Sequence, residues 1–214
     1  KSSVDILFVG DGYTKKDLGR SGTYLKDVKR CVKGFFKEIP FKWYEDRFNV
    51  RAAMLESKER GCDPSRDEDS VDTALNSAFD SADGRLLEFR DREKLSGVAK
   101  SAGGADIVFV MVNTERYGGA GGTLLDLVKK GEYGPAPTFS AMDSTSFLIA
   151  VHELGHSFAN LEDEYVEENE AQHARFPLPE SSDTDIEGPN VTRAGLFDPT
   201  DFKSLKATVR WRHF

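Results

Sequence analysis

Apolar runs of strand length alternate with segments of helical periodicity along this chain of 214 residues. Three segments are typical of strands: 4–9 and 107–112 as continuous apolar runs, and 47–55 because apolar residues recur at every second position from 48 to 54. Helical spacing of apolar residues predicts helices over 15–37, with an interruption near 19–22, and over 71–79 and 85–100. This alternation predicts an α/β (α+β) fold built on a mixed sheet, in one domain spanning 1–214.

A further helix is predicted around residue 150. Its apolar residues recur at steps of three and four positions: Phe147, Val151, Leu154, Phe158 and Leu161. Asp143 or Ser144 is placed to cap the start of this helix. Asn160 is placed to end it, because asparagine tolerates the left-handed backbone conformation better than most residues.

This helix carries the sequence His152-Glu153-Leu154-Gly155-His156, which has the pattern H-E-x-x-H. Two histidines four residues apart lie on one face of a helix, at a separation that one zinc ion can bridge. Glu153 lies beside them, where a general base for water activation is needed. The competing interpretation is a core helix with two buried histidines and a solvated glutamate. The chain contains only four histidines, so a chance match is rare.

A catalytic zinc needs a third protein ligand and an open position for water. Metzincin-type sites turn the chain after the helix and supply that ligand a few residues later. Asp163 lies three residues beyond Asn160 and is the preferred third ligand, with Glu162 and then Glu164 as alternatives. In a gluzincin arrangement the third ligand is instead a glutamate on a later helix. The candidates for that arrangement are Glu167, Glu168, Glu170 and Glu180.

The segment 152–165, HELGHSFANLEDEY, resembles the active-site segment of the IgA-peptidase family of bacterial zinc metalloendopeptidases. Further stretches also resemble that family: 5–14, 106–113, 117–122, 189–192 and 211–214. The resemblance implies a metzincin-like catalytic domain whose mixed sheet packs against the H-E-x-x-H helix. It also implies zinc as cofactor, His152, His156 and Asp163 as ligands, Glu153 as general base, and a protein or peptide substrate, although IgA itself as the substrate does not transfer.

Members of this family carry a methionine after the zinc motif, in a segment suited to a Met-turn. Here Met54, Met111 and Met142 all precede the motif. We therefore expect the methionine segment to lie beyond Phe214 or to be absent. An alternative function is a non-catalytic extracellular binding module on a peptidase-like scaffold, in which the metal is structural or missing.

The glycine-rich stretch 117–122 has two interpretations. It is either a flexible loop or a sheet edge that lies over the zinc cleft. Such an edge holds an extended peptide as an added strand, and glycines let the peptide backbone approach. On the second interpretation Tyr117, Gly118 and Gly119 contact the substrate.

Charge and composition narrow the partners. The net charge of −8 argues against nucleic acid, which is bound by basic surfaces, and no apolar run approaches the length of a membrane span. Family resemblance implies an extracellular, periplasmic or cell-surface protein whose leader has been removed. The two cysteines, Cys31 and Cys62, can pair in an oxidising compartment, although a buried free thiol is commoner for a cysteine on a helix face.

Overall fold

The computed structural model describes residues 3–67, 70–80, 84–127, 130–142 and 144–161. The chain divides into two compact units, Lys1–Phe158 and Ala159–Phe214, and the fold presented here is that of the first unit. Asp163, its alternatives Glu162 and Glu164, and all four gluzincin candidates lie outside the described residues. No described helix is long and apolar enough to cross a lipid bilayer.

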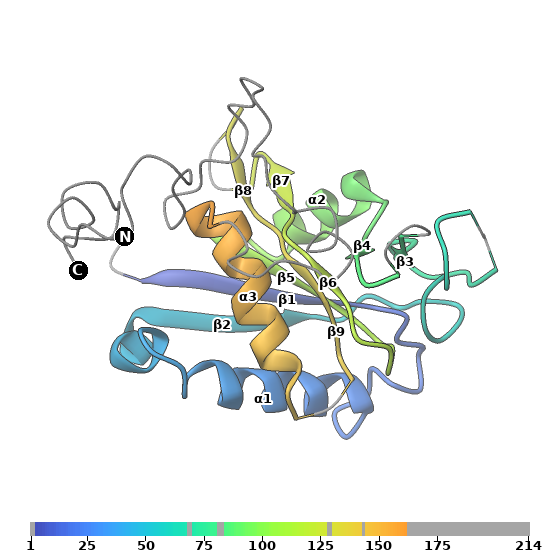
Figure 1. The fold of residues 1–214 in the computed structure, drawn as a ribbon, viewed down its shortest axis with the longest axis horizontal. Helices are drawn as coiled ribbons and strands as arrows, with labels where there is room; N and C mark the ends of the chain where they lie inside the picture. The colour runs from blue at the N-terminus through green and yellow to red at the C-terminus, as the bar shows by residue number, and fades with distance from the viewer. Residues whose placement is uncertain (1–2, 68–69, 81–83, 128–129, 143, 162–214) are drawn as a thin grey trace, which may run out of the picture. The chain divides into compact units, whose positions relative to one another are not determined.

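The core of the first unit is a five-stranded mixed sheet with the strand order β2-β1-β5-β9-β6 (Figure 1). Its strands are β1 (Val4–Asp11), β2 (Phe48–Ala53), β5 (Ile107–Val112), β6 (Gly119–Ala120) and β9 (Thr138–Ser140). Four strands run parallel, and only β6 at one edge is antiparallel to its neighbour β9. The mixed α/β fold predicted from the sequence is confirmed.

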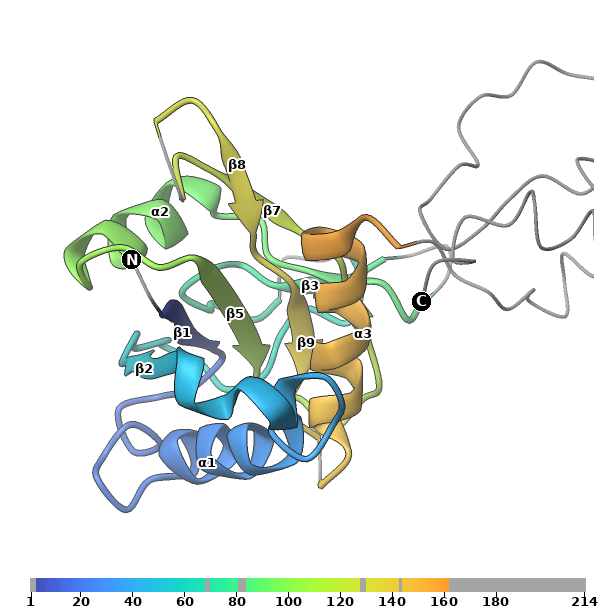
Figure 2. The same cartoon turned by 90° about the vertical axis from the view of Figure 1, so that its left-hand side faces the viewer.

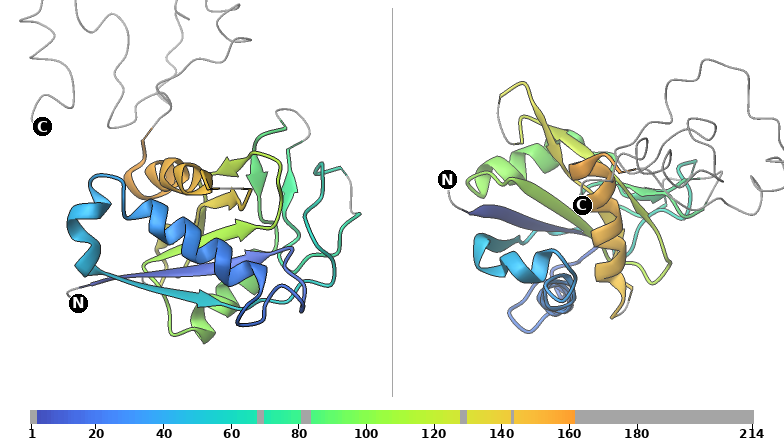
Figure 3. Two further views of the ribbon diagram at one scale, coloured as in Figure 1. Left: turned by 90° about the horizontal axis from the view of Figure 1, so that it is seen from below. Right: turned by 60° about the vertical axis from the view of Figure 1, so that its left-hand side comes forward.

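Helices cover both faces of this sheet. Helices α1 (Thr23–Phe35) and α3 (Ser146–Ala159) pack on one face, and α2 (Arg92–Ser101) packs on the other (Figures 2 and 3). Successive side chains of a strand point to opposite faces, so β1 sends Ile6 and Phe8 towards α1 and α3. Its alternate residues, Leu7 and Val9, face α2. Burial on both faces explains the continuous apolar runs of β1 and β5.

Two short strand pairings and a 3-10 helix complete the described part of the unit. Strands β3 (Ala78–Phe79) and β4 (Leu87–Glu88) form one two-stranded sheet. Strands β7 (Thr123–Leu125) and β8 (Tyr133–Pro135) form an antiparallel hairpin that follows β6 directly. A 3-10 helix, η1 (Phe41–Arg47), precedes β2 after a cis peptide bond at Ile39–Pro40.

Helix α1 is shorter than the predicted segment 15–37 and begins only at Thr23. The pair Thr14 and Asp17, which has the spacing of a capping box, closes a turn instead. The Asp17 carboxylate accepts hydrogen bonds from the backbone N–H and the hydroxyl of Thr14. The glycines after this turn then delay the helix, because glycine is a poor helix former.

The prediction of a helix over 71–79 is wrong, because the buried Asp11 organises this segment as an irregular loop. Asp11 ends β1, and its Oδ1 accepts a hydrogen bond from the backbone N–H of Leu75. Its Oδ2 accepts bonds from the Thr73 hydroxyl and from the N–H of Ser77. A helix would point these donors along its own axis, so the carboxylate favours the loop.

Substitution of Asp11 by asparagine is expected to lower the free energy of unfolding by about 2–4 kcal/mol. The new amide NH₂ would face donors on Thr73 and Ser77, or on Leu75 if the amide is flipped, and each buried donor would lose its acceptor. Urea unfolding followed by tryptophan fluorescence measures the change. Asp72→Asn, on an exposed carboxylate, is the control and should change stability by less than about 0.5 kcal/mol. Equal stability of the two variants would contradict this role of Asp11.

The predicted helix 85–100 is also only partly correct. Its first residues form β4, and α2 begins at Arg92. Asp91 caps α2, because its side chain accepts a hydrogen bond from the backbone N–H of Lys94. The apolar spacing of Leu86, Leu87 and Phe89 therefore belongs to an extended segment.

Both cysteines are free thiols in the structure. Cys31 lies in the core on α1, where burial raises the pKa of its thiol to about 12. Burial likewise raises the pKa of the Cys62 thiol to about 11. Because the thiolate is the reactive form, both side chains are expected to be poor nucleophiles at neutral pH.

Candidate metal centre

Helix α3 carries the H-E-x-x-H motif and ends as the sequence predicts. It stops at Ala159, and Asn160 has a φ of 53°, in the left-handed region. Its start differs from the prediction. Thr145 directly precedes the helix and its carbonyl accepts a hydrogen bond from Leu148 N, so Ser144 lies one residue too early to cap it. Asp143 lies outside the described residues.

The buried face of α3 is rotated from the predicted apolar stripe. The buried residues are Ser146, Ile149, Ala150, Glu153 and Leu154. Phe147 and Val151 are half-buried at the flank, where Phe147 packs against Gly34 of α1, and Phe158 is 68% exposed. The small residues Ser146 and Ala150 face the sheet and let the helix approach it closely. A pattern based on large apolar residues does not include them.

The two histidines of the motif converge at one point. Their Nε2 atoms are 3.1 Å apart, and their rings are nearly perpendicular, with centroids separated by 4.6 Å. Zn–N bonds of 2.0–2.1 Å at a tetrahedral angle place two such nitrogens about 3.3 Å apart. His152 and His156 therefore fit as two ligands of one zinc ion, provided that both imidazoles carry their proton on Nδ1.

Glu153 lies beside this pair and is buried. Its side chain, with that of His152 and His156, forms a group whose ligand-type atoms all lie within 4.8 Å of one another. Glu153 is only 8% exposed, whereas neither histidine is buried. This burial is the reverse of the competing interpretation, in which the histidines are buried and the glutamate is solvated.

The glycine-rich segment passes directly along α3. A methyl group on Gly119 would lie 2.5 Å from Oε1 of Glu153, and one on Gly121 would lie 2.6 Å from Cβ of His156. Only a residue without a side chain fits at these two positions. The glycine-rich segment and α3 are thus in close contact at Gly119 and Gly121.

The outer side of β6 is partly covered by the chain that leads into β4. Gly119 N donates a hydrogen bond to Arg85 O, and Leu86 forms a parallel bridge with Gly119. Gly118 O accepts a bond from Ser140 N, and the Tyr117 side chain is exposed. The polar backbone at Gly118 and Gly119 is therefore used within the protein. The sequence pattern does not predict that the segment before β4 pairs with β6.

The backbone of the glycine-rich segment is unpaired two residues after Gly119, at Gly121. No described residue hydrogen-bonds the N–H or the C=O of Gly121. Its position against His156 places this free backbone beside the metal motif.

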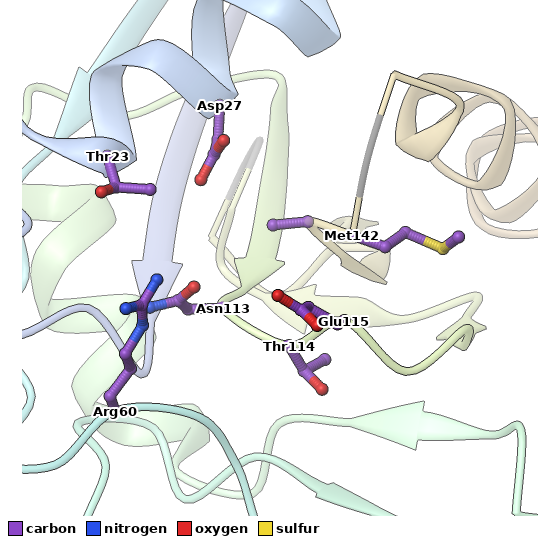
Figure 4. Close-up of a pocket in the computed structure, with 8 residues that line it drawn as sticks. Thr23, Asp27, Arg60, Asn113, Thr114, Glu115 and Met142 are labelled. Atoms are coloured by element: carbon purple, nitrogen blue, oxygen red, sulfur yellow. The ribbon is translucent and has the colours of Figure 1, made fainter.

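A separate polar cavity of about 500 Å³ lies beyond the carboxyl ends of the parallel strands (Figure 4). Its lining residues come from α1, from the loop around Arg60 and from the ends of β5 and β9: Thr23, Asp27, Arg60, Asn113, Thr114, Glu115, Ala141 and Met142. Asp27 is already satisfied there by the Tyr13 hydroxyl and by Arg30. Neither motif histidine lines this cavity.

One of two comparisons with known proteins found a match. A family model described as IgA Peptidase M64 matches residues 1–203 of the chain. The search of curated proteins found no match. The matched range includes the sheet, the motif helix and the residues beyond it.

Proposed function

The chain belongs to the IgA Peptidase M64 family, and on that premise we propose that it is a zinc-dependent endopeptidase with a metzincin-like arrangement of its site. The observation that carries this proposal is the approach of the two histidine Nε2 atoms to 3.1 Å, with a buried carboxylate beside them. The family supports a peptidase. The two converging imidazole nitrogens, with Glu153 beside them as a base, support zinc.

His152 and His156 would hold the ion, with Asp163 as the proposed third ligand. When bound, zinc supplies a Lewis acid that polarises the scissile carbonyl and lowers the pKa of water to about 7. Glu153 accepts the proton of the attacking water and passes it to the leaving amine. Its burial keeps this carboxylate out of bulk water, next to the reacting atoms.

We propose that the substrate is a polypeptide in extended conformation, bound at the end of the glycine-rich segment 117–122 where Gly121 is open. The glycines let this segment lie directly against α3, so that its backbone borders the motif. Because the backbone of Gly118 and Gly119 is engaged internally, we assign the hydrogen bonds to substrate to Gly121. Action on proteins outside the cytoplasm is part of the same proposal.

The proposal predicts one zinc ion per chain and hydrolysis of unfolded protein that is lost on chelation and restored by added zinc. Asp163→Ala should weaken zinc binding by at least about 100-fold, because a ligand is removed outright. Glu162→Ala and Glu164→Ala are the matched controls and should bind zinc like the parent. Metal analysis after dialysis and a casein digestion assay provide the two measurements.

Two outcomes would count against parts of this assignment. Tight zinc binding by Asp163→Ala, with loss in one of the controls, moves the third ligand to that control residue. Stoichiometric zinc in the parent without any chelator-sensitive cleavage rejects the peptidase activity and favours the non-catalytic binding module.

A further inference from the structure

The glycine-rich segment beside α3 continues directly into the β7–β8 hairpin. Figures 1 and 2 show this hairpin beside the C-terminal half of α3. Two of its side chains, Leu125 and Tyr133, are large, apolar and exposed, by 45% and 66% respectively. They lie directly opposite each other in the strand register. We call this pair the hairpin shelf.

The shelf lies on the side of the hairpin that faces the metal motif. The Cβ directions of Gly119 and Gly121 point to Glu153 and His156. Side chains two residues apart on an extended strand project from the same face, so Leu125 projects from the same face as the two glycines. Its neighbour Leu124 points the opposite way, consistent with its burial in the core.

The outward backbone groups along this path pair with no strand of the described residues, and Thr123 O alone accepts a side-chain hydrogen bond, from Arg92. Ala136 N donates to Gly122 O, and bonded pairs recur at every second residue of an antiparallel ladder. The N–H and C=O groups of Gly121, Thr123 and Leu125 therefore point away from the β8 partner. Pairs that do not exchange hydrogen bonds have the closer Cα atoms, so Leu125 and Tyr133 form a continuous apolar surface.

The two ends of this path differ. At Gly119 the Arg85–Leu87 segment already occupies the outer side. Nearer the hairpin, Arg92 Nη1 donates a hydrogen bond to Thr123 O. No other described side chain donates a hydrogen bond to the outward carbonyls of Gly121, Thr123 and Leu125. Arg92 is exposed, so a peptide strand that displaces this one contact is accommodated from Gly121 towards Leu125. At about 3.3 Å per residue, Leu125 lies about 13 Å beyond Gly121, or about four substrate residues.

We propose that the hairpin shelf binds an apolar side chain of the substrate about four residues from the cleaved peptide bond. This inference rests on the proposed function, since the path is measured from the metal motif. A substrate strand paired with the outer edge of β7 places a side chain next to Leu125 on the shelf face, as neighbouring strands of any sheet do. The enzyme should therefore prefer substrates by the identity of a residue that lies remote from the cleaved peptide bond.

The test is a set of peptides that share one cleavable bond and carry leucine or serine at each position up to about six residues away. The parent should prefer leucine at a single position three to five residues from the bond, by about three- to fivefold in kcat/KM. Leu125→Ser should remove this preference, and Tyr133→Ser should reduce it. These two variants should cleave peptides that carry serine at that position as fast as the parent does. Met54→Ser and Tyr44→Ser, exposed apolar residues next to β2 at the opposite sheet edge, are the controls.

Peptide binding to the Glu153→Gln variant, measured by fluorescence anisotropy, separates this inference from the proposed function. If the parent cleaves but shows no remote preference, or keeps it in Leu125→Ser, the shelf is rejected and the peptidase stands. If the parent does not cleave but apolar peptides bind in a Leu125-dependent manner, the catalytic proposal fails and the shelf stands. Absence of both cleavage and Leu125-dependent binding rejects both.

Discussion

Glu153→Gln should retain one zinc ion per chain and lose hydrolysis by about 10²–10⁴-fold, the usual contribution of a general base. Glutamine has nearly the shape of glutamate, so the packing of this side chain against Gly119 is preserved. The ligand nitrogens of His152 and His156 are not altered. What is lost is the ability to accept a proton from water, since a neutral amide is a very weak base.

The measurement is kcat/KM for a fluorogenic peptide at saturating zinc, together with zinc content and melting temperature. Glu115→Gln is the matched control, because Glu115 lines the separate polar cavity and does not touch the motif. It should cut like the parent. If Glu153→Gln cuts as fast as the parent, the role given to Glu153 is wrong. Loss of zinc together with activity would instead make Glu153 part of the metal's support.

The central sheet was predictable because its strands have strong local signals. Strand β5 has the predicted bounds, since a run of six apolar residues buried on both faces has no good alternative. The segments 71–79 and 85–100 were not predictable in the same way. In the first, a single carboxylate from β1 provides the hydrogen bonds that a helix would otherwise make. Such a contact joins residues more than sixty positions apart and leaves no local pattern.

The motif was predictable to a similar extent. Helical periodicity and four-residue spacing indicate that His152 and His156 meet, and they do. The tolerance of Asn160 for a positive φ correctly marks the end of the helix. The burial of Glu153 was not predictable, because it depends on the approach of Gly119 from another strand. Glycine-rich composition alone is equally consistent with a flexible loop.

The contact between β6 and α3 yields the second large effect. Gly119→Ala should lower kcat/KM by about 10²-fold, because misplacement of a catalytic group by about 1 Å has that consequence. The new methyl group would lie 2.5 Å from Oε1 of Glu153 and 2.7 Å from Cγ2 of Ile149. Either the strand or the helix must shift, and the carboxylate moves away from its position beside the histidines. Overpacking of this kind should also lower the free energy of unfolding by about 1–3 kcal/mol.

Gly97→Ala is the control for this substitution. Gly97 lies in α2, and no atom outside its own helix lies within 4 Å of a methyl group there. Its replacement should leave activity unchanged and raise stability by up to about 1 kcal/mol, as expected for alanine in a helix. The zinc content of Gly119→Ala distinguishes displacement of the base from loss of the metal as the cause of lower activity. The methyl group meets Glu153 and not the rings of the ligands, so zinc should be retained. Retained zinc with reduced turnover supports displacement of the base, whereas full activity of Gly119→Ala would show that the strand does not position Glu153.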